Sequence, residues 1–159
     1  MADAAGGAYF AGGGYAEYVK IKTSQLIALP QNLDTVEGAS VAEVYLTAYQ
    51  CLFTIAGLKN SQKVLIHAGA SGVGCAAIQL AKAKNCYVVA TVGNEDKVKA
   101  CQKLGADKVI NYHNEDYVQW SKSNVPEGYD IIIDVVAGSY VNKNINIAAL
   151  DAHIVILAI

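Results

Sequence analysis

A glycine-rich turn at residues 67–86, HAGASGVGCAAIQLAKAKNC, separates a run of β-branched residues from a run of helix formers. Gly69, Gly72 and Gly74 approximate the pattern G-x-G-x-x-G, with Ser71 where the second glycine usually stands. Such a turn can bring backbone N–H groups and the positive end of a helix dipole against a phosphate. So loose a match also fits a glycine turn without a ligand. The strand-like KVLIH before it and the helical residues after it favour a site for a dinucleotide pyrophosphate.

The end of the next strand bears on which dinucleotide would bind. An NAD site usually places Asp or Glu there, about 20 residues on, to accept the ribose 2′-hydroxyl. In ATVGNEDKVK that place is held by Val92 and Gly93, and Lys97 follows. A small residue and a cation suit a 2′-phosphate, which a carboxylate would repel. We interpret Glu95 and Asp96 as exposed residues that complement a helix dipole, and a solvated helix lysine fits Lys97 equally well on these grounds. The pattern favours NADP(H) over NAD(H).

Two later strand ends carry a polar residue. Tyr112 could pack on an adenosine or belong to the core, and Asp134 could be a site residue or cap a turn. No pair or triad of residues suits general acid–base or nucleophilic catalysis, so we assign no catalytic residue. That absence is compatible with hydride transfer, where the cofactor supplies the chemistry and the protein orients it.

The elements that must position these residues alternate from residue 63 onward. The sequence predicts strands at 63–68, 86–92, 107–112, 129–136 and 152–159, and helices at 72–84, 95–104, 114–123 and 139–149. Continuous Val and Ile runs are typical of parallel strands that are buried on both faces. The alternation therefore predicts an α/β fold, a doubly wound parallel Rossmann sheet of about five strands.

The residues before this alternation do not fit it. They predict short strands at 15–22 and 26–30 and a mostly apolar helix at 38–57. We expect residues 1–37 to be the remnant of another β-rich unit and residues 38–159 to form the nucleotide-binding domain. Because the last strand ends without a polar cap, we expect the chain to be cut at both ends. Its exposed edge could pair copies of the chain into a homo-oligomer.

Composition excludes several classes of function. A net charge of −2, without a basic stripe, predicts no binding to nucleic acid or to anionic membranes. The first residues do not form a signal peptide, and no apolar run approaches the ~20 residues that span a bilayer. The four cysteines are scattered without a CxxC pair, so we interpret them as buried reduced thiols and expect no metal site. A cytoplasmic protein with a small-molecule partner is expected.

Several motifs together resemble a known family. GGGYAEYVKI, EVYLTAYQCL, VLIHAGASGVGCAAIQLAK, TVGNEDKV, KLGADKVINY and GSYVNKNI follow one another in its order and spacing. The chain is similar, from about Gly12 onward, to the zinc-free, zeta-crystallin-like quinone oxidoreductase branch of the medium-chain dehydrogenase/reductase family.

The resemblance implies a GroES-like β-rich domain beside a Rossmann domain, and reduction of quinones or activated α,β-unsaturated carbonyls with NADPH and no metal. The pyrophosphate would lie on residues 71–73, the 2′-phosphate and adenosine near Gly93, Lys97 and Tyr112, and the nicotinamide near Thr47. The cofactor-binding residues expected are Thr47, Gly69, Ser71, Gly72, Val73, Gly74, Gly93, Lys97 and Tyr112.

Complete members of that branch are longer than this chain. We therefore expect much of the substrate cleft to be missing and quinone turnover to be weak or absent, while the adenosine half of the cofactor site survives. The alternative is a truncated, non-catalytic module that binds a nucleotide or another protein.

Overall fold

The computed structural model describes residues 15–157. The chain divides into two compact units, Met1–Leu46 and Thr47–Ile159. The second unit contains one five-stranded sheet in the order β3-β2-β1-β4-β5, in which every neighbouring pair is parallel. The strands are β1 Lys63–Ile66, β2 Tyr87–Val92, β3 Lys108–Asn111, β4 Tyr129–Asp134 and β5 Ala148–Ile156. The predicted doubly wound parallel sheet is confirmed.

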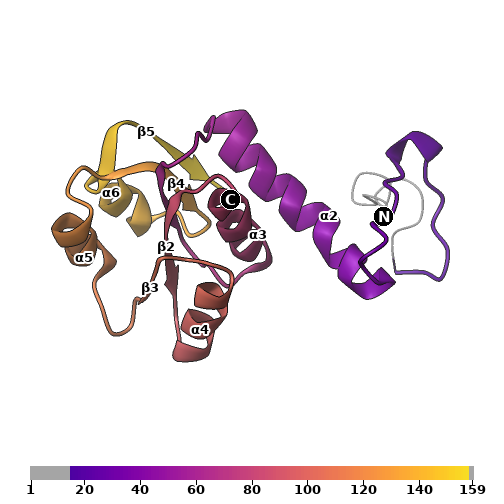
Figure 1. Ribbon diagram of the computed structural model, residues 1–159, viewed down its shortest axis with the longest axis horizontal. Coiled ribbons are helices and arrows are strands. Elements are labelled where there is room, and N and C mark those ends of the chain that lie inside the picture. Colours follow the sequence, from indigo (N-terminus) through magenta and orange to yellow (C-terminus); the bar gives the residue numbers. More distant parts are fainter. Residues whose placement is uncertain (1–14, 158–159) are drawn as a thin grey trace. The chain divides into compact units, whose positions relative to one another are not determined.

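Four helices connect these strands: α3 Gly72–Lys82, α4 Glu95–Lys103, α5 Tyr117–Asn124 and α6 Ser139–Ile145. Figure 1 shows α3 and α4 on one side of the sheet and α5 and α6 on the other. Side chains that accept hydrogen bonds from free N–H groups of the first turn mark three of the helix starts: Ser71 for α3, Asn94 for α4 and Asp116 for α5. The predicted order of strands and helices from residue 63 onward is therefore correct.

The start of β5 differs from the prediction. Helix α6 ends at Ile145, and β5 already begins at Ala148, inside the stretch 139–149 expected to be helical. Pairing with β4 explains the difference, because Tyr129 lies opposite Ala148 and a register irregularity follows between positions 129 and 131. Asp151, with φ of 60°, lies in the β5 segment that spans this irregularity. A long-range strand pairing thus overrides the local pattern.

The N-terminal unit also departs from the prediction. Residues 15–22 and 26–30 form no strand ladder; a 3-10 turn, Thr23–Gln25, lies between them, and only an isolated bridge is found at Leu26. A strand needs a neighbour that supplies backbone partners, and a sequence pattern for strands does not by itself provide one. The expectation of two strands here is therefore wrong for this structure.

A long helix follows these residues. Helix α2 spans Thr35–Tyr49 and continues as a π-helical segment over Gln50–Ile55, so it begins three residues before the predicted start. Its N-terminus is closed by a capping box, in which the Glu37 N–H donates to Asp34 and the Asp34 N–H donates to the Glu37 carboxylate. Among residues 15–157, no helix is long and apolar enough to cross a membrane.

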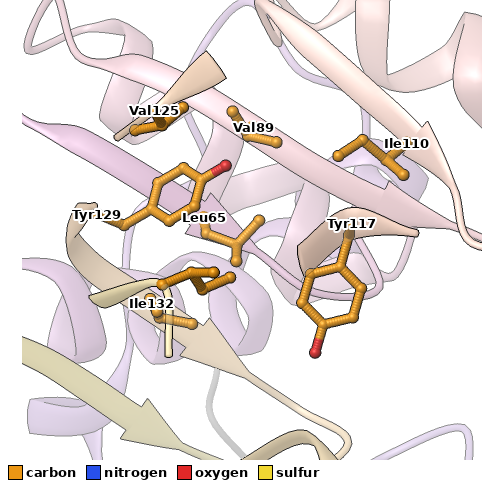
Figure 2. Packing of buried hydrophobic residues seen from close by; sticks show 8 residues of the cluster. Leu65, Val89, Ile110, Tyr117, Val125, Tyr129 and Ile132 are labelled. Carbon is orange, nitrogen blue, oxygen red and sulfur yellow. The ribbon is translucent and has the colours of Figure 1, made fainter. Parts of the chain in front are cut away.

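One hydrophobic cluster packs against the sheet face that α5 and α6 cover. It takes side chains from β1, β2, β3 and β4, two of them from β4, together with Tyr117 of α5 and residues of the loops after α5 and before β5 (Figure 2): Leu65, Val89, Ile110, Tyr129, Ile132, Tyr117, Val125 and Ile147. The strand residues alternate with side chains on the opposite face. This core fixes the carboxyl ends of the strands, where the candidate site lies.

Candidate nucleotide-binding site

A cavity of about 310 Å³ lies at the carboxyl ends of the central strands. Four of the predicted cofactor residues lie together in its lining: Ser71, Gly93, Lys97 and Tyr112. Val92, which precedes Gly93 at the end of the strand, also lines the cavity. The sequence did not point to the other five lining residues, which are Ala68, Ala70, Thr91, Val136 and Tyr140. Open α/β sheets bind ligands at this position, outside the strand ends where the strand order reverses.

Gly69 and Gly74 do not line this cavity. A Cβ on Gly74 would lie 2.5 Å from the Ala68 carbonyl oxygen, and one on Gly69 would lie 2.7 Å from the Ala90 Cβ. Real Cβ atoms do not approach other atoms so closely. Both glycines are therefore needed for α3 to pack tightly against β1 and β2, which brings the start of the helix to the cavity.

The start of α3 leaves two backbone donors without a partner. Ser71 closes the helix: its N–H donates to the Ala68 carbonyl, and its Oγ accepts the Gly74 N–H at 3.1 Å. The N–H groups of Gly72 and Val73 precede the intrahelical hydrogen bonds, and neither finds an acceptor among residues 15–157. These two N–H groups, with the helix dipole behind them, can receive an anion next to Ser71.

Lys97 carries a cation into the cavity lining. Its ammonium forms no ion pair in the described part of the chain, and its backbone N–H donates to the capping Asn94 side chain. The neighbouring Glu95 is held elsewhere, because its carboxylate accepts hydrogen bonds from Asn111 at 2.7 Å and Asn114 at 3.3 Å. No carboxylate is among the residues that line the cavity, so the local charge there is positive.

Tyr112 is a cavity residue and not a core residue, since 46% of it is exposed. Its ring contacts His113, with 4.7 Å between the ring centroids. Its hydroxyl reaches Gly93, where a Cβ would lie 2.5 Å from the hydroxyl oxygen. A side chain at position 93 would therefore displace Tyr112 and narrow the cavity beside Lys97.

Thr47 is not brought into this cavity. It lies half-buried in α2, and the cavity lining contains no residue of that helix. Of the nine predicted cofactor residues, Thr47 is thus the one that neither lines the cavity nor belongs to the turn that shapes it.

Asp134 caps the turn after β4, one of the two roles left open by the sequence. Its Oδ1 accepts the N–H groups of Val136 at 2.8 Å and Ala137 at 2.9 Å, and the residue is fully buried. The turn is strained at Ala137, which has a φ of 57°. Through this turn Asp134 presents Val136 to the cavity without lining it.

A second cavity, also of about 310 Å³, adjoins the first and shares Tyr112 and Tyr140 with it. Tyr117 and Tyr140 stack there with centroids 5.4 Å apart, and the Lys143 ammonium lies within 6 Å of both rings (5.9 and 5.7 Å). Burial raises the pKa of Tyr117 far above its usual value, and its buried hydroxyl has no hydrogen-bond partner within residues 15–157. This tyrosine thus stays protonated at neutral pH.

The cysteines are free thiols, as predicted. Cys51, Cys86 and Cys101 are buried, and Cys75 is half-buried. Burial raises the pKa of each, that of Cys101 to about 11, so none provides a thiolate nucleophile near neutral pH. Within residues 15–157, no group of three or more His, Cys, Asp or Glu residues is arranged to hold a metal ion.

Known proteins are similar to this chain in sequence and in fold. The family model described as zinc-binding dehydrogenase matches residues 72–159, which is more than half of the chain. The chain belongs to the zinc-binding dehydrogenase family. A quinone oxidoreductase of Pongo abelii is 34% identical over 146 residues, which cover 91% of this chain and 44% of that protein.

Two solved structures extend the family comparison to the fold. An NAD-dependent alcohol dehydrogenase superposes with a TM-score of 0.85 at 35% identity, over 91% of this chain and 42% of that one. The JamJ enoyl reductase superposes with a TM-score of 0.78 at 30% identity, over 85% of this chain and 41% of that one. The resemblance to the quinone oxidoreductase branch of the medium-chain dehydrogenase/reductase family is confirmed.

The chain spans less than half the length of each of these relatives. Over the part that they share, this chain and the two solved structures have the same fold. This family and fold make it a pyridine-nucleotide-binding domain of an oxidoreductase family.

Proposed function

We propose that this chain is the nucleotide-binding part of an NADPH-dependent oxidoreductase of the quinone reductase type. The observation that carries the proposal is Lys97, which lines a cavity with Gly93 and Tyr112 and forms no ion pair within residues 15–157, while no carboxylate is among the described lining residues. A 2′-phosphate would be attracted there, whereas a site for NAD usually presents an Asp or Glu to the ribose hydroxyl.

The residues present fit such a cofactor. The N–H groups of Gly72 and Val73, which have no acceptor in the described part of the chain, would receive the pyrophosphate, and the exposed ring of Tyr112 would lie against the adenosine. When bound, NADPH supplies the hydride for the reduction of a quinone or an activated α,β-unsaturated carbonyl. The chain itself would bind and orient the cofactor, with Lys97 compensating the charge of the additional phosphate. We assign no residue to proton transfer.

The printed names of the relatives support the substrate class, since they include quinone oxidoreductases and an enoyl reductase. By the same resemblance we propose that the reaction uses no zinc, that residues 1–37 derive from a GroES-like domain, and that the protein is cytoplasmic. Thr47 stays a proposed neighbour of the nicotinamide. Metal analysis of the purified chain tests the first of these points, and stoichiometric zinc would contradict it.

Steady-state oxidation of NADPH with a simple ortho- or para-quinone tests the proposed activity. We expect quinone-dependent oxidation that is weak, because the chain is much shorter than its relatives, and that is faster with NADPH than with NADH. Lys97→Ala should abolish this preference, whereas Lys99→Ala, a matched change on the same helix, should preserve it. Equal rates with NADPH and NADH in the unmodified chain would contradict the proposal.

The alternative is a non-catalytic module that assembles through its sheet edge. It is favoured by the edge strand β5, on which Leu150 is 93% exposed and Ile156 46% exposed. Sedimentation at increasing concentration separates the two functions. A monomer at every concentration would argue against assembly, and a stable oligomer that does not oxidise NADPH would favour it.

A further inference from the structure

Four buried polar side chains form one hydrogen-bonded network beneath the nucleotide cavity. The Nδ1 of His67 lies 2.9 Å from Thr91 Oγ1, and its Nε2 lies 2.8 Å from Asn144 Oδ1. Asn144 Nδ2 donates to Asp134 Oδ2 at 2.9 Å. Each of the four is at most 1% exposed, so water does not compete for these hydrogen bonds. The network joins the ends of β1, β2 and β4 to helix α6.

The Asp134 carboxylate sets the orientation of Asn144. Its Oδ1 already accepts two backbone N–H groups, of Val136 and Ala137, and both of its oxygens are acceptors. Asn144 must therefore turn its Nδ2 toward Asp134 and its Oδ1 toward His67. The opposite orientation would set an amide oxygen against a carboxylate oxygen.

The orientation of Asn144 in turn determines where His67 holds its proton. Because Asn144 Oδ1 can only accept, the Nε2 of His67 must carry the proton. Burial lowers the pKa of His67 from its usual 6.5, although the hydrogen bond to Asn144 and the charge of Asp134 counter this effect. The ring is thus neutral near pH 7, and its bare Nδ1 accepts the Thr91 hydroxyl proton.

Every member of the network is part of a cavity wall or joined to one. Thr91 lines the cavity itself, Ala68 follows His67 directly, and Val136 donates its N–H to Asp134. Ala68 has a φ of 50° and Ala137 a φ of 57°, so two walls contain strained backbone that the surrounding contacts must hold in place. A change of hydrogen-bond direction in the network would therefore affect the cavity lining at Ala68, Thr91 and Val136 together.

We propose that Asp134 and Asn144 are positioning residues: the Asp134 carboxylate, acting through Asn144, selects the Nε2-protonated form of His67 and holds the turn after β4 against the nucleotide cavity. The effect on nucleotide affinity rests on the proposed function, whereas the selection of the histidine tautomer does not. Measurements of the His67 tautomer therefore test the role of Asp134 independently of the cofactor, and measurements of nucleotide affinity test the effect on the cavity.

Nitrogen-15 NMR of the histidine rings tests the tautomer in the nucleotide-free chain at neutral pH. We expect a protonated Nε2 and an unprotonated Nδ1 for His67. In Asp134→Asn the amide oxygen must stay with the two backbone N–H groups, so its Nδ2 faces Asn144. Asn144 then flips, and the proton of His67 moves to Nδ1. Thr91→Val, which removes only the hydroxyl donor, should keep the proton on Nε2.

Amide exchange and nucleotide affinity test the positioning. In Asp134→Asn the Val136 and Ala137 amides should exchange faster than in the unmodified chain, and the Kd for NADPH should rise about tenfold, as expected for one charge-assisted hydrogen bond. The matched control is Ser121→Ala, which removes a buried hydrogen bond of 2.9 Å to Tyr129 outside the network. It should leave the tautomer, the exchange of both amides and the Kd unchanged.

Three results would overturn the proposal. The first is a charged or Nδ1-protonated His67 in the unmodified chain, which requires no variant to fold. The second is an Nε2 proton retained in a folded Asp134→Asn, and the third is a proton that moves in Thr91→Val. If the tautomers are as expected but the unmodified chain binds no NADPH, the proposed cofactor fails while the role of Asp134 stands.

Discussion

Two walls of the nucleotide cavity are built on different principles. The β1–α3 turn depends on side chains that are absent, because Gly69 and Gly74 let the helix approach the sheet to a distance that any Cβ would prevent. The β4–α6 turn depends on side chains that are present and buried, with Asp134 holding two backbone N–H groups over a strained Ala137. We therefore expect an added side-chain atom at Gly69 or Gly74 to disrupt the first wall, and loss of the Asp134 acceptor oxygen to disrupt the second.

The largest effect is expected where the glycine wall is filled. In Gly74→Ala the new Cβ would meet three backbone atoms, the nearest at 2.5 Å, and backbone cannot move aside cheaply. We expect a loss of about 3 kcal/mol of unfolding free energy, the upper end of the usual cost of overpacking. Denaturant unfolding measures it. Gly93→Ala is the control, since its Cβ meets only the exposed Tyr112 side chain, and an equal loss in both variants would contradict this comparison.

Removing the cation of Lys97, which lines the same cavity, should change nucleotide affinity and not stability. In Lys97→Ala we expect the Kd for NADPH to rise about tenfold, as for the loss of one charge-assisted contact, while the Kd for NADH stays unchanged. Fluorescence titration with both nucleotides measures this. Lys99→Ala should alter neither Kd. A similar rise in the Kd for NADPH in that variant would mean that the overall positive charge of the helix, and not the position of Lys97, attracts the nucleotide.

The buried network of the second wall should make stability depend on pH. Burial lowers the pKa of His67 below its unfolded value near 6.5, so protons bind the unfolded chain more tightly than the folded one. His67 does not make stability depend on pH above about pH 6.5, where it is neutral in both states. As the pH falls below that value, protons bind the unfolded chain first and the folded state loses stability. Thermal unfolding of the unmodified chain and of His67→Gln at several pH values measures this. Equal pH dependence in the two would show that other groups cause it.

The smallest effect is expected from relaxing the strained turn of the second wall. Ala137 has a φ of 57°, which glycine adopts without steric cost, so Ala137→Gly should raise the unfolding free energy by up to about 1 kcal/mol. Gly138→Ala makes the reciprocal change at a φ of 56°, with no atom within 4 Å of the new Cβ, and should lower it by a similar amount. Melting temperatures that shift in the same direction in both variants would contradict this interpretation of the turn.

The same contrast explains which features could be predicted from the sequence. Continuous Val and Ile runs located the strands, and the glycine turn located the start of α3, because each of these signals lies within a few consecutive residues. Gly93 and Lys97 were predicted as cofactor residues from a similarly local signal, the residues just after β2, and the structure places both in the cavity lining.

Features that depend on distant residues escaped prediction. His67 and Asn144 are separated by 77 positions, and only the packing of α6 on the sheet brings them together. The early start of β5 depends on its pairing with β4, and within residues 15–157 the expected strands at 15–22 and 26–30 join no strand ladder. Tyr140 stood in the recognised motif GSYVNKNI, yet nothing local indicated that it lines the cavity.

Equilibrium binding of NADPH and NADH to the purified chain tests the central claim most directly. Within the described residues, the cavity lining holds a lysine without an ion pair and no carboxylate. Such a cavity should bind NADPH at least about tenfold more tightly than NADH, corresponding to one charge-assisted contact with the 2′-phosphate. Equal affinity for the two nucleotides, or no detectable binding of either, would contradict it.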